Sequence, residues 1–300
     1  MMKNIGPPRV DCFLIGTPKS GSTFLCDALS QNPSICVSRS HNSMQKEPNI
    51  ISTHKGTFPR DDSEPNWHLY SKCFVGPGIR LDASVHTMAC ELAPSRIMQY
   101  YPNSRFIVLI REPVSRSISH WNMILDSGED KQHGSDWGDF REAWADPRLR
   151  DYSLYGKSLE NWLAYFQLSR FLFITSDELR DSPHKCLRRV ESHMGASEFT
   201  YDFEKIKNSN SASSRPNFTK AGRILNRIFS FIPWKVKRPI STILARLEIN
   251  IYSPKILSKP GGNKQRKPDA ELLEIVRSET YEDLELFSTI SGFDLSAWSE

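Results

Sequence analysis

The stretch that decides the fold lies near the N-terminus and reads LIGTPKSGSTF at residues 14–24. The spacing of its two glycines fits a triphosphate-binding loop, whose pattern is G-x-x-x-x-G-K-[ST]. Thr23 stands at the hydroxyl position of that pattern, but Ser22 replaces the lysine, and the lysine comes three residues earlier, at Lys19. The stretch therefore predicts an anion-binding loop whose cation is placed differently from that of a triphosphate loop.

The residues on either side supply the context that an anion-binding loop needs. The run DCFLIG at 11–16 predicts a buried strand, and the apolar spacing over 22–29 predicts a helix that ends before Pro33. Backbone N–H groups converge at a helix N-terminus, and the helix dipole adds partial positive charge there. Lys19 adds a full charge, on the side where its ammonium can reach a group that leaves or joins a single phosphate.

A second strand and helix follow at residues 105–121, which read RFIVLIREPVSRSISHW. The nearly continuous apolar run at 105–110 is typical of a parallel strand covered on both faces. It ends in Arg111, where a triphosphate-binding protein would carry an acidic magnesium ligand, and the arginine indicates a second bound anion. The run FLFIT at 171–175 predicts a third buried strand, preceded by a helix across 159–166. This alternation predicts a single P-loop-like α/β domain with a central parallel sheet and helices on both faces.

Composition narrows the class of protein. The chain has 300 residues, 38% of them hydrophobic, and a net charge of only +4, so we expect a packed core and no nucleic-acid partner. The longest apolar run, at 106–110, is too short to span a bilayer, and no secretory signal is visible. The six cysteines show no C-x-x-C spacing, so we expect no metal and a reduced, cytoplasmic protein.

Taken together, the two motifs resemble those of the sulfotransferases that use 3′-phosphoadenosine 5′-phosphosulfate (PAPS). In that family P-K-[ST]-G-[ST]-[ST] binds the 5′-phosphosulfate, and R-[DE]-P-x-x-R-x-x-S follows a strand and binds the 3′-phosphate. The resemblance implies that Lys19 is catalytic and stabilises charge on the bridging oxygen. The donor-binding residues that it implies are Lys19, Ser20, Gly21, Ser22, Thr23, Arg111 and Ser119. Adenosine 3′,5′-bisphosphate (PAP) would be the product.

A third motif supports the resemblance. Lys46-Glu47-Pro48 resembles the K-E-P motif of the bacterial-type and heparan-type members, and this implies that Glu47 is the general base. The segment Asp82-Ala83-Ser84 is similar to their E-x-[ST]-P segment. However, Ala83 replaces a lysine that contacts the sugar chain in the heparan-type enzymes, and this weakens a glycosaminoglycan acceptor. The resemblance predicts in-line sulfuryl transfer to a hydroxyl or amine of a carbohydrate or small-molecule acceptor.

Simpler roles remain open for each of these side chains. Lys19 can be a solvated loop residue, Glu47 can pair with Lys46, and Arg111 can pair with its neighbour Glu112. Arg116 can brace the loop without touching a ligand. Four histidines compete with Glu47 as the base, because the pKa of histidine lies near neutrality; they are His41, His54, His86 and His120.

The segment 205–265 differs from the rest of the chain, since it begins rich in serine and asparagine and continues as a basic segment with apolar residues between the charges. We expect one sulfotransferase domain over 1–300, with 205–265 as a helical or loop insertion or a lid at the acceptor site. The Gly/Pro-containing stretch at 259–266 resembles the late loop that closes on the 3′-phosphate in this family. From 268 onward PDAELLEIVRSETYEDLELF predicts an amphipathic helix.

Two other functions fit parts of the sequence. A P-loop kinase for a small molecule would use the first loop, although Ser22 and Arg111 oppose it. A protein of the membrane surface would use residues 222–251, where basic and aromatic residues alternate, although Pro233 and Pro239 interrupt any helix. Liposome co-sedimentation with and without this segment separates the membrane hypothesis from the others. The sequence leaves the acceptor and the oligomeric state open.

Overall fold

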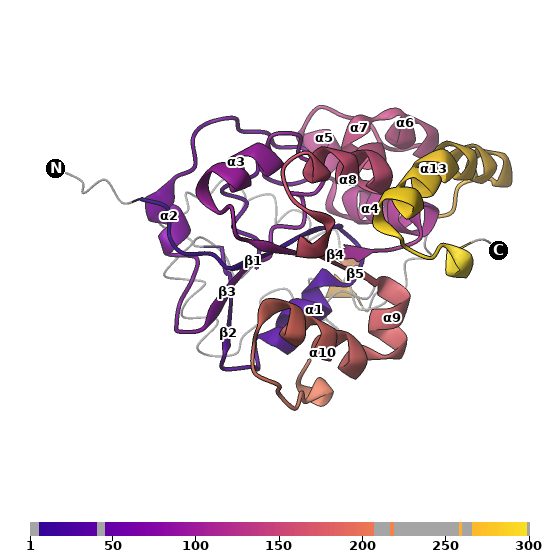
Figure 1. Ribbon diagram of the computed structural model, residues 1–300. Helices are drawn as coiled ribbons and strands as arrows, with labels where there is room; N and C mark the ends of the chain where they lie inside the picture. The colour runs from indigo at the N-terminus through magenta and orange to yellow at the C-terminus, as the bar shows by residue number, and fades with distance from the viewer. Residues whose placement is uncertain (1–5, 41–45, 207–216, 219–257, 260–265, 299–300) are drawn as a thin grey trace. The chain divides into compact units, whose positions relative to one another are not determined.

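The computed structural model in Figure 1 describes residues 6–40, 46–206, 217–218, 258–259 and 266–298. The chain divides into two compact units, one formed by Met1–Ile206 with Arg266–Glu300 and the other by Lys207–Gln265. In the second unit β6 (Asn217–Phe218) pairs with β7 (Ser258–Lys259) in antiparallel fashion. The segment 222–251, with its predicted membrane contact, and most of the predicted late loop lie outside the described residues.

The first unit is built on a five-stranded parallel sheet, which confirms the predicted fold class. The strand order is β2-β3-β1-β4-β5. The strands are β1 (Cys12–Gly16), β2 (Ile35–Val37), β3 (Ile79–Asp82), β4 (Arg105–Ile110) and β5 (Phe171–Thr175). The strands β2 and β3 lie on one side of β1, and β4 and β5 lie on the other. The order in which strands are added to the sheet therefore reverses between β1 and β4. In open parallel sheets, ligands bind beyond the carboxyl ends of the strands at such a point.

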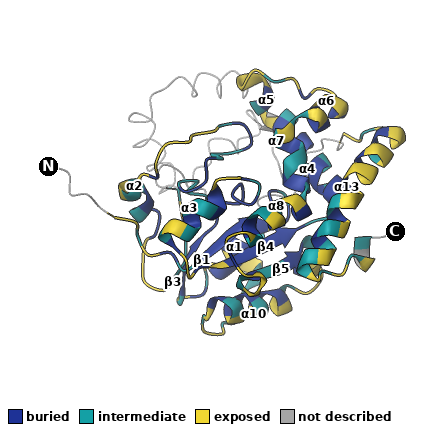
Figure 2. Ribbon diagram, turned by 45° about the horizontal axis from the view of Figure 1, so that its top comes forward, coloured by how far each residue is buried: buried dark blue, intermediate teal, exposed yellow. Residues whose placement is uncertain are grey.

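Side chains from alternate positions of the strands enter two separate cores. The strands β1 and β4 are buried along nearly their whole length (Figure 2). On one face Phe13, Phe106 and Val108 pack with α3 (Ala93–Tyr100), α8 (Tyr155–Leu163) and α13 (Ala270–Ser291). On the other face Leu14, Ile107 and Leu109 pack with α1 (Ser22–Leu29), α9 (Ser176–Asp181) and α10 (Pro183–Met194). Both faces of the strands are therefore apolar, as their nearly continuous hydrophobic runs predicted.

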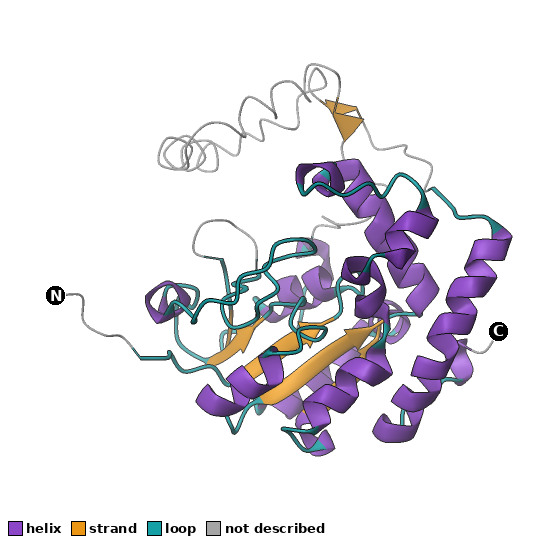
Figure 3. Ribbon diagram, turned by 90° about the horizontal axis from the view of Figure 1, so that it is seen from above, coloured by secondary structure: helices purple, strands orange, loops and turns teal. Residues whose placement is uncertain are grey.

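Helices surround the strands of the sheet (Figure 3). A third core forms around one of them, α4 (Pro113–Ser127). It includes Trp121, Trp137 and Trp144, which are buried, and Trp162 is buried in the first core. The other α-helices of the described residues are α2 (Trp67–Ser71), α5 (Glu129–Gln132), α6 (Phe140–Ala145) and α7 (Pro147–Arg150). In the described ranges no helix is long and apolar enough to cross a membrane.

The helix predicted across 159–166 is α8, and it begins four residues earlier, at Tyr155. Its first turn is capped from another helix, because the carboxylate of Asp283 on α13 accepts hydrogen bonds from the N–H groups of Gly156 and Lys157, both at 2.8 Å. Free N–H groups at a helix start need such partners. A cap supplied from more than a hundred residues away leaves no local signal, so the sequence pattern placed the start too late.

Candidate functional site

The predicted anion loop follows β1 and is fixed to β4 by hydrogen bonds. The N–H and the hydroxyl of Thr17 both donate to the carbonyl oxygen of Leu109, at 2.5 and 3.1 Å. The hydroxyls of Thr17 and Ser20 lie 2.8 Å apart, and both side chains are buried. Since the Thr17 hydroxyl already donates to Leu109, the Ser20 hydroxyl donates to Thr17. The loop is therefore built on the strand that carries the second motif.

The loop ends at Gly21, the residue before α1, in a backbone conformation that requires glycine. Its φ is 97°, and a Cβ there would lie 3.1 Å from a methyl carbon of Leu179. In this described segment no side chain caps α1, and its first turn holds no acidic residue. The N–H groups of the first turn of α1 are therefore a ready site for an anion.

Arg111 comes directly after β4 and lies beside this loop. Its guanidinium approaches the carbonyl oxygen of Lys19 at 3.5 Å, and its own carbonyl oxygen accepts a hydrogen bond of 2.6 Å from the Tyr155 hydroxyl. The carboxylate of Glu112 caps α4 by accepting from the N–H groups of Val114 and Ser115, at 2.8 and 2.7 Å. The Glu112 carboxylate is thus engaged with the helix, and Arg111 faces the loop.

Lys19 and Ser119 lie in different places relative to this loop. The ammonium of Lys19 is 3.6 Å from the sulfur of Met123, so the lysine side chain reaches toward α4. Ser119 lies on α4, eight residues after Arg111, and is half-buried. None of the described hydrogen bonds joins Ser119 to Arg111 or to the loop.

Arg116 is a structural residue of α4. Its guanidinium is fully buried and donates to the hydroxyl of Ser153 at 2.8 Å and to the carbonyl oxygen of Leu149 at 2.9 Å. A third nitrogen lies 3.1 Å from Nδ1 of His120. Burial lowers the pKa of Arg116 to about 10, so the side chain is still charged at neutral pH. These contacts hold α4 to the segment 149–153, and none of them reaches the anion loop.

Glu47 follows β2 and pairs with its neighbour, as the simpler hypothesis for it proposed. Its Oε1 lies 2.8 Å from Nζ of Lys46, and its Oε2 lies 3.8 Å from Nε2 of His86. Burial acts to raise the pKa of Glu47, but the Lys46 ammonium and His86 outweigh it, and the pKa is below its usual value. Glu47 is therefore an ionised carboxylate at neutral pH, with 23% of its side chain exposed. An ion pair and a role as a base are compatible, because an ionised carboxylate is what accepts a proton.

Three of the four histidines considered as bases lie in one polar cluster around Tyr152, and His41 lies outside the described residues. Nδ1 of His86 and Nδ1 of His54 lie 3.0 and 3.3 Å from the Tyr152 hydroxyl. His120 lies nearby, with its ring 5.7 Å from that of Tyr152. Burial lowers the pKa of His86 to about 4 and that of His54 to about 3, and it lowers the pKa of His120 strongly. All three rings are neutral at pH 7.

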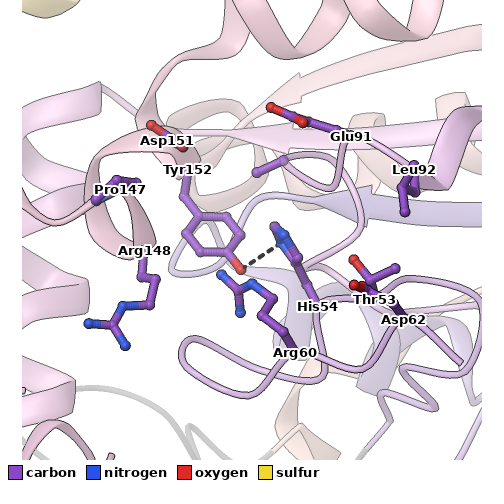
Figure 4. A pocket seen from close by; sticks show the side chains of 11 residues that line it. Thr53, His54, Arg60, Asp62, Glu91, Leu92, Pro147, Arg148, Asp151 and Tyr152 are labelled. Atoms are coloured by element: carbon purple, nitrogen blue, oxygen red, sulfur yellow. Dashed lines mark hydrogen bonds between the residues drawn. The ribbon is translucent and has the colours of Figure 1, made fainter. Parts of the chain in front are cut away.

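A pocket of about 360 Å³ opens beside this cluster (Figure 4). His54 and Tyr152 form part of its wall, and the hydrogen bond between them is visible in the figure. Charged side chains of both signs, among them Arg60, Asp62 and Glu91, surround the opening. Lys19, Glu47 and His86 do not line it, but His86 links its wall to Glu47, because it contacts the Tyr152 hydroxyl at 3.0 Å and Glu47 at 3.8 Å.

The structure brings Lys19, Gly21 and Arg111 together at the switch point, on one loop and the strand beside it. Sequence reasoning missed Thr17, which ties the loop to β4, and Tyr152, which organises the histidines. The first could have been found, because Thr17 is a hydroxyl residue inside the predicted loop. The second could not, because Tyr152 stands in a short 3₁₀ helix (Asp151–Ser153) with no motif around it.

Comparisons with known proteins agree with this geometry. A family model of the sulfotransferase domain matches residues 9–226. Heparan sulfate glucosamine 3-O-sulfotransferase 6 of Mus musculus is 25% identical over 209 residues, covering 63% of this chain and 54% of that protein. Heparan sulfate glucosamine 3-O-sulfotransferase 3B1 of Mus musculus is 27% identical over 192 residues, covering 61% and 45%. The chain thus spans about half the length of the curated relatives it matches.

Among solved structures, the crystal structure of a sulfotransferase from Alicyclobacillus acidocaldarius is similar with a TM-score of 0.62. The two chains are 16% identical, and the match covers 98% of this chain and 100% of the other. At this level of identity the likeness shows the fold alone.

Proposed function

The chain belongs to the sulfotransferase domain family, and from that premise we propose that it transfers a sulfuryl group from PAPS to an acceptor hydroxyl or amine. One observation carries the proposal most directly. The uncapped N-terminus of α1 and the side chain of Arg111 meet at the loop between β1 and α1. Two separate sources of positive charge suit a donor that carries a 5′-phosphosulfate and a 3′-phosphate.

The residues of the loop fit the 5′ end of such a donor. Gly21, Ser22 and Thr23 would hold the phosphate through the N–H groups of the first turn and the hydroxyl groups of Ser22 and Thr23. Ser20 would contribute only its backbone, because its buried hydroxyl is bonded to Thr17. Lys19 would stabilise the charge that develops on the bridging oxygen as the S–O bond breaks.

Arg111 and Ser119 would bind the 3′-phosphate. Support for Arg111 is its place at the end of β4, beside the loop, with Glu112 engaged in capping α4. Ser119 rests on the family motif, since it lies on α4 without a described contact to the loop. The donor's anions are then met by lysine, arginine and backbone N–H groups, and the proposal includes no metal.

Glu47 would act as the general base. Its ionised carboxylate can take the proton of an acceptor hydroxyl while the oxygen of that hydroxyl attacks sulfur, so that the S–O bond to the acceptor forms as the bond to the phosphate breaks. Lys46, at 2.8 Å, keeps Glu47 ionised before the reaction. A proton on Glu47 is released again at neutral pH because the pKa of the carboxyl is low.

A carbohydrate is the acceptor class that we favour. The support comes from the names of the relatives, which are heparan sulfate glucosamine 3-O-sulfotransferases. Ala83 argues for a sugar other than a long sulfated chain, because the cation expected at that position for such a chain is missing. A cytoplasmic location stays a prediction.

The donor site can be tested by thermal unfolding of the full chain with PAP, compared with ATP and magnesium. A ligand at about 100 times its Kd stabilises the folded protein by about 2.7 kcal/mol, which raises Tm by about 2–6 °C for a domain of this size. We expect the rise with PAP and its loss in Arg111→Ala, while the exposed-arginine control Arg180→Ala keeps it. A rise with magnesium-ATP alone would favour the kinase hypothesis, and no rise with either ligand would overturn the donor site.

A further inference from the structure

Tyr152 joins three segments of the chain that are far apart in the sequence. It is buried, and its hydroxyl contacts Nδ1 of His86 at 3.0 Å, Nδ1 of His54 at 3.3 Å and the carbonyl oxygen of Gly56 at 3.4 Å. The ring of His86 also packs edge-on against that of Tyr152, with centroids 5.3 Å apart. The His86 ring is thus held by a hydrogen bond and by an aromatic contact with the same residue.

The other ring nitrogen of His86 faces the predicted base. Nε2 lies 3.8 Å from Oε2 of Glu47, while Oε1 of Glu47 is held by Lys46. His86 is neutral at pH 7, because burial lowers its pKa, and a neutral imidazole carries one N–H. An ionised carboxylate attracts an N–H and repels a lone pair, so the proton lies on Nε2. Nδ1 is then an acceptor, and the Tyr152 hydroxyl must donate to it.

We propose that His86 and Tyr152 are positioning residues for Glu47: the Tyr152 hydroxyl fixes the ring of His86 so that its Nε2–H points at Oε2 of the carboxylate. The inference rests on the proposed function, in which Glu47 is the general base. With Lys46 on one oxygen and His86 on the other, the carboxylate cannot rotate freely, and its remaining lone pairs have a fixed direction. The acceptor proton moves to Glu47 alone, and His86 and Tyr152 keep their protons.

The distance of 3.8 Å between Nε2 of His86 and Oε2 of Glu47 is longer than a hydrogen bond. We expect the two atoms to form a hydrogen bond when the acceptor binds. Hydrogen bonds of catalytic groups are often long in the free enzyme and shorten in the complex with substrate. His54 contributes from the other side, since it faces the oxygen of the Tyr152 hydroxyl and lines the pocket. A base is commonly oriented by a further group in this way.

The first test needs no acceptor. In the full chain labelled with ¹⁵N-histidine, NMR distinguishes a protonated from an unprotonated ring nitrogen, and His86→Gln identifies the signals of His86. We expect the wild type at pH 7 to show a single His86 tautomer with the proton on Nε2. Tyr152→Phe removes only the hydroxyl, and we expect it to populate both tautomers. The matched control is Tyr101→Phe, which removes another buried tyrosine hydroxyl, one that donates to the carbonyl oxygen of Pro8.

The second test measures the pKa of Glu47 by ¹³C NMR of the carboxyl group in two variants of His86. The side-chain amide of His86→Gln can place an N–H near the former Nε2, while that of His86→Asn reaches only the position of Nδ1. We expect the pKa of Glu47 to rise in the asparagine variant and to stay near the wild-type value in the glutamine variant. Equal pKa values in both variants, or a His86 tautomer that does not respond to Tyr152→Phe, would overturn the proposal.

A third test measures by enzyme kinetics whether Tyr152 and His86 affect the reaction. With PAPS and short unsulfated oligosaccharide fragments that contain glucosamine, we expect Tyr152→Phe to lower kcat about 10- to 100-fold, the cost of a misplaced catalytic group, and to leave KM for PAPS unchanged. An unchanged kcat would show that His86 and Tyr152 do not position Glu47. If the wild-type protein binds PAP but does not sulfate these fragments, the proposed acceptor is wrong. The two NMR tests then decide by themselves whether His86 and Tyr152 position Glu47. A wild-type protein that does not bind PAP counts against the proposed function.

Discussion

Buried polar side chains set the electrostatic character of the site. Arg116 and His120 are fully buried on α4 and contact each other at 3.1 Å, and Nε2 of His120 lies 2.8 Å from the Thr57 hydroxyl. Because burial and the positive charges of Arg116 and Lys19 disfavour the imidazolium, the pKa of His120 lies well below 6.5. The cluster can therefore stay hydrogen-bonded only while its histidines are neutral.

This makes stability depend on pH in a definite direction. His120 is neutral in the folded protein at pH values where it becomes protonated in the unfolded chain. Its contribution is therefore fully present above pH 6.5 and is lost as the pH falls below that value toward the folded pKa. We expect the unfolding free energy of the wild type, measured by urea denaturation, to fall between pH 6.5 and 5. In His120→Gln this fall should be smaller by about 1.4 kcal/mol per pH unit, the effect of one proton.

The control is His68→Gln, which removes an exposed histidine of α2. We expect it to keep the pH dependence of the wild type. If His120→Gln and His68→Gln show the same slope, His120 is not held neutral by its burial and the assignment of the cluster is wrong.

At the scale of the elements, α8 and α13 pack closely at a glycine. A Cβ on Gly156 would lie 2.4 Å from the carbonyl oxygen of Asp283 and 2.9 Å from the backbone nitrogen of Phe287. Both are backbone atoms, which cannot move aside as the end of a flexible side chain can. The same contact lets the Asp283 carboxylate cap α8. Close packing and capping thus depend on one another.

We expect Gly156→Ala to separate the two helices and to lower the unfolding free energy by about 2–3 kcal/mol, in the range of overpacked cores. Urea denaturation measures the loss. The control is Gly6→Ala, where a Cβ would meet no atom within 4 Å. Equal stability of the two variants would mean that α8 and α13 do not approach each other at this residue.

The sequence predicted those elements whose signals are local. The apolar runs predicted β1, β4 and β5, and the helical spacing predicted α1 and α13. The strand β3 was missed, because the sequence IRLD is short and carries a charge at each second position. The site shows the same division. Lys19, Gly21 and Arg111 lie in motifs and could be predicted, whereas Tyr152 and His86 meet only through the tertiary fold.

For the whole molecule, the reactivity of the buried cysteines measures how the unit that contains the sheet unfolds. All six thiols are free and buried. Burial raises the pKa of Cys26 on α1 to about 12 and that of Cys12 on β1 still further, so neither forms the reactive thiolate in the folded protein. Burial also acts to raise the pKa of Cys90, but hydrogen bonds, chiefly with Thr53 at 3.2 Å, outweigh it and the pKa is lowered.

We therefore expect a thiol reagent such as 5,5′-dithiobis(2-nitrobenzoate) to react with the native protein slowly and with Cys90 first. Cys90 lies in a loop beside the pocket, where a local opening exposes it, whereas Cys12 lies in the central strand and requires the sheet to unfold. A ligand that binds the folded state, such as PAP, lowers the population of the unfolded state, so at about 100 times its Kd it should slow the labelling of Cys12 about 100-fold. Cys90→Ser should remove the fast phase alone. If Cys12 reacts as fast as Cys90, the sheet opens without global unfolding, and the fold would have to be held together more weakly than its two apolar cores indicate.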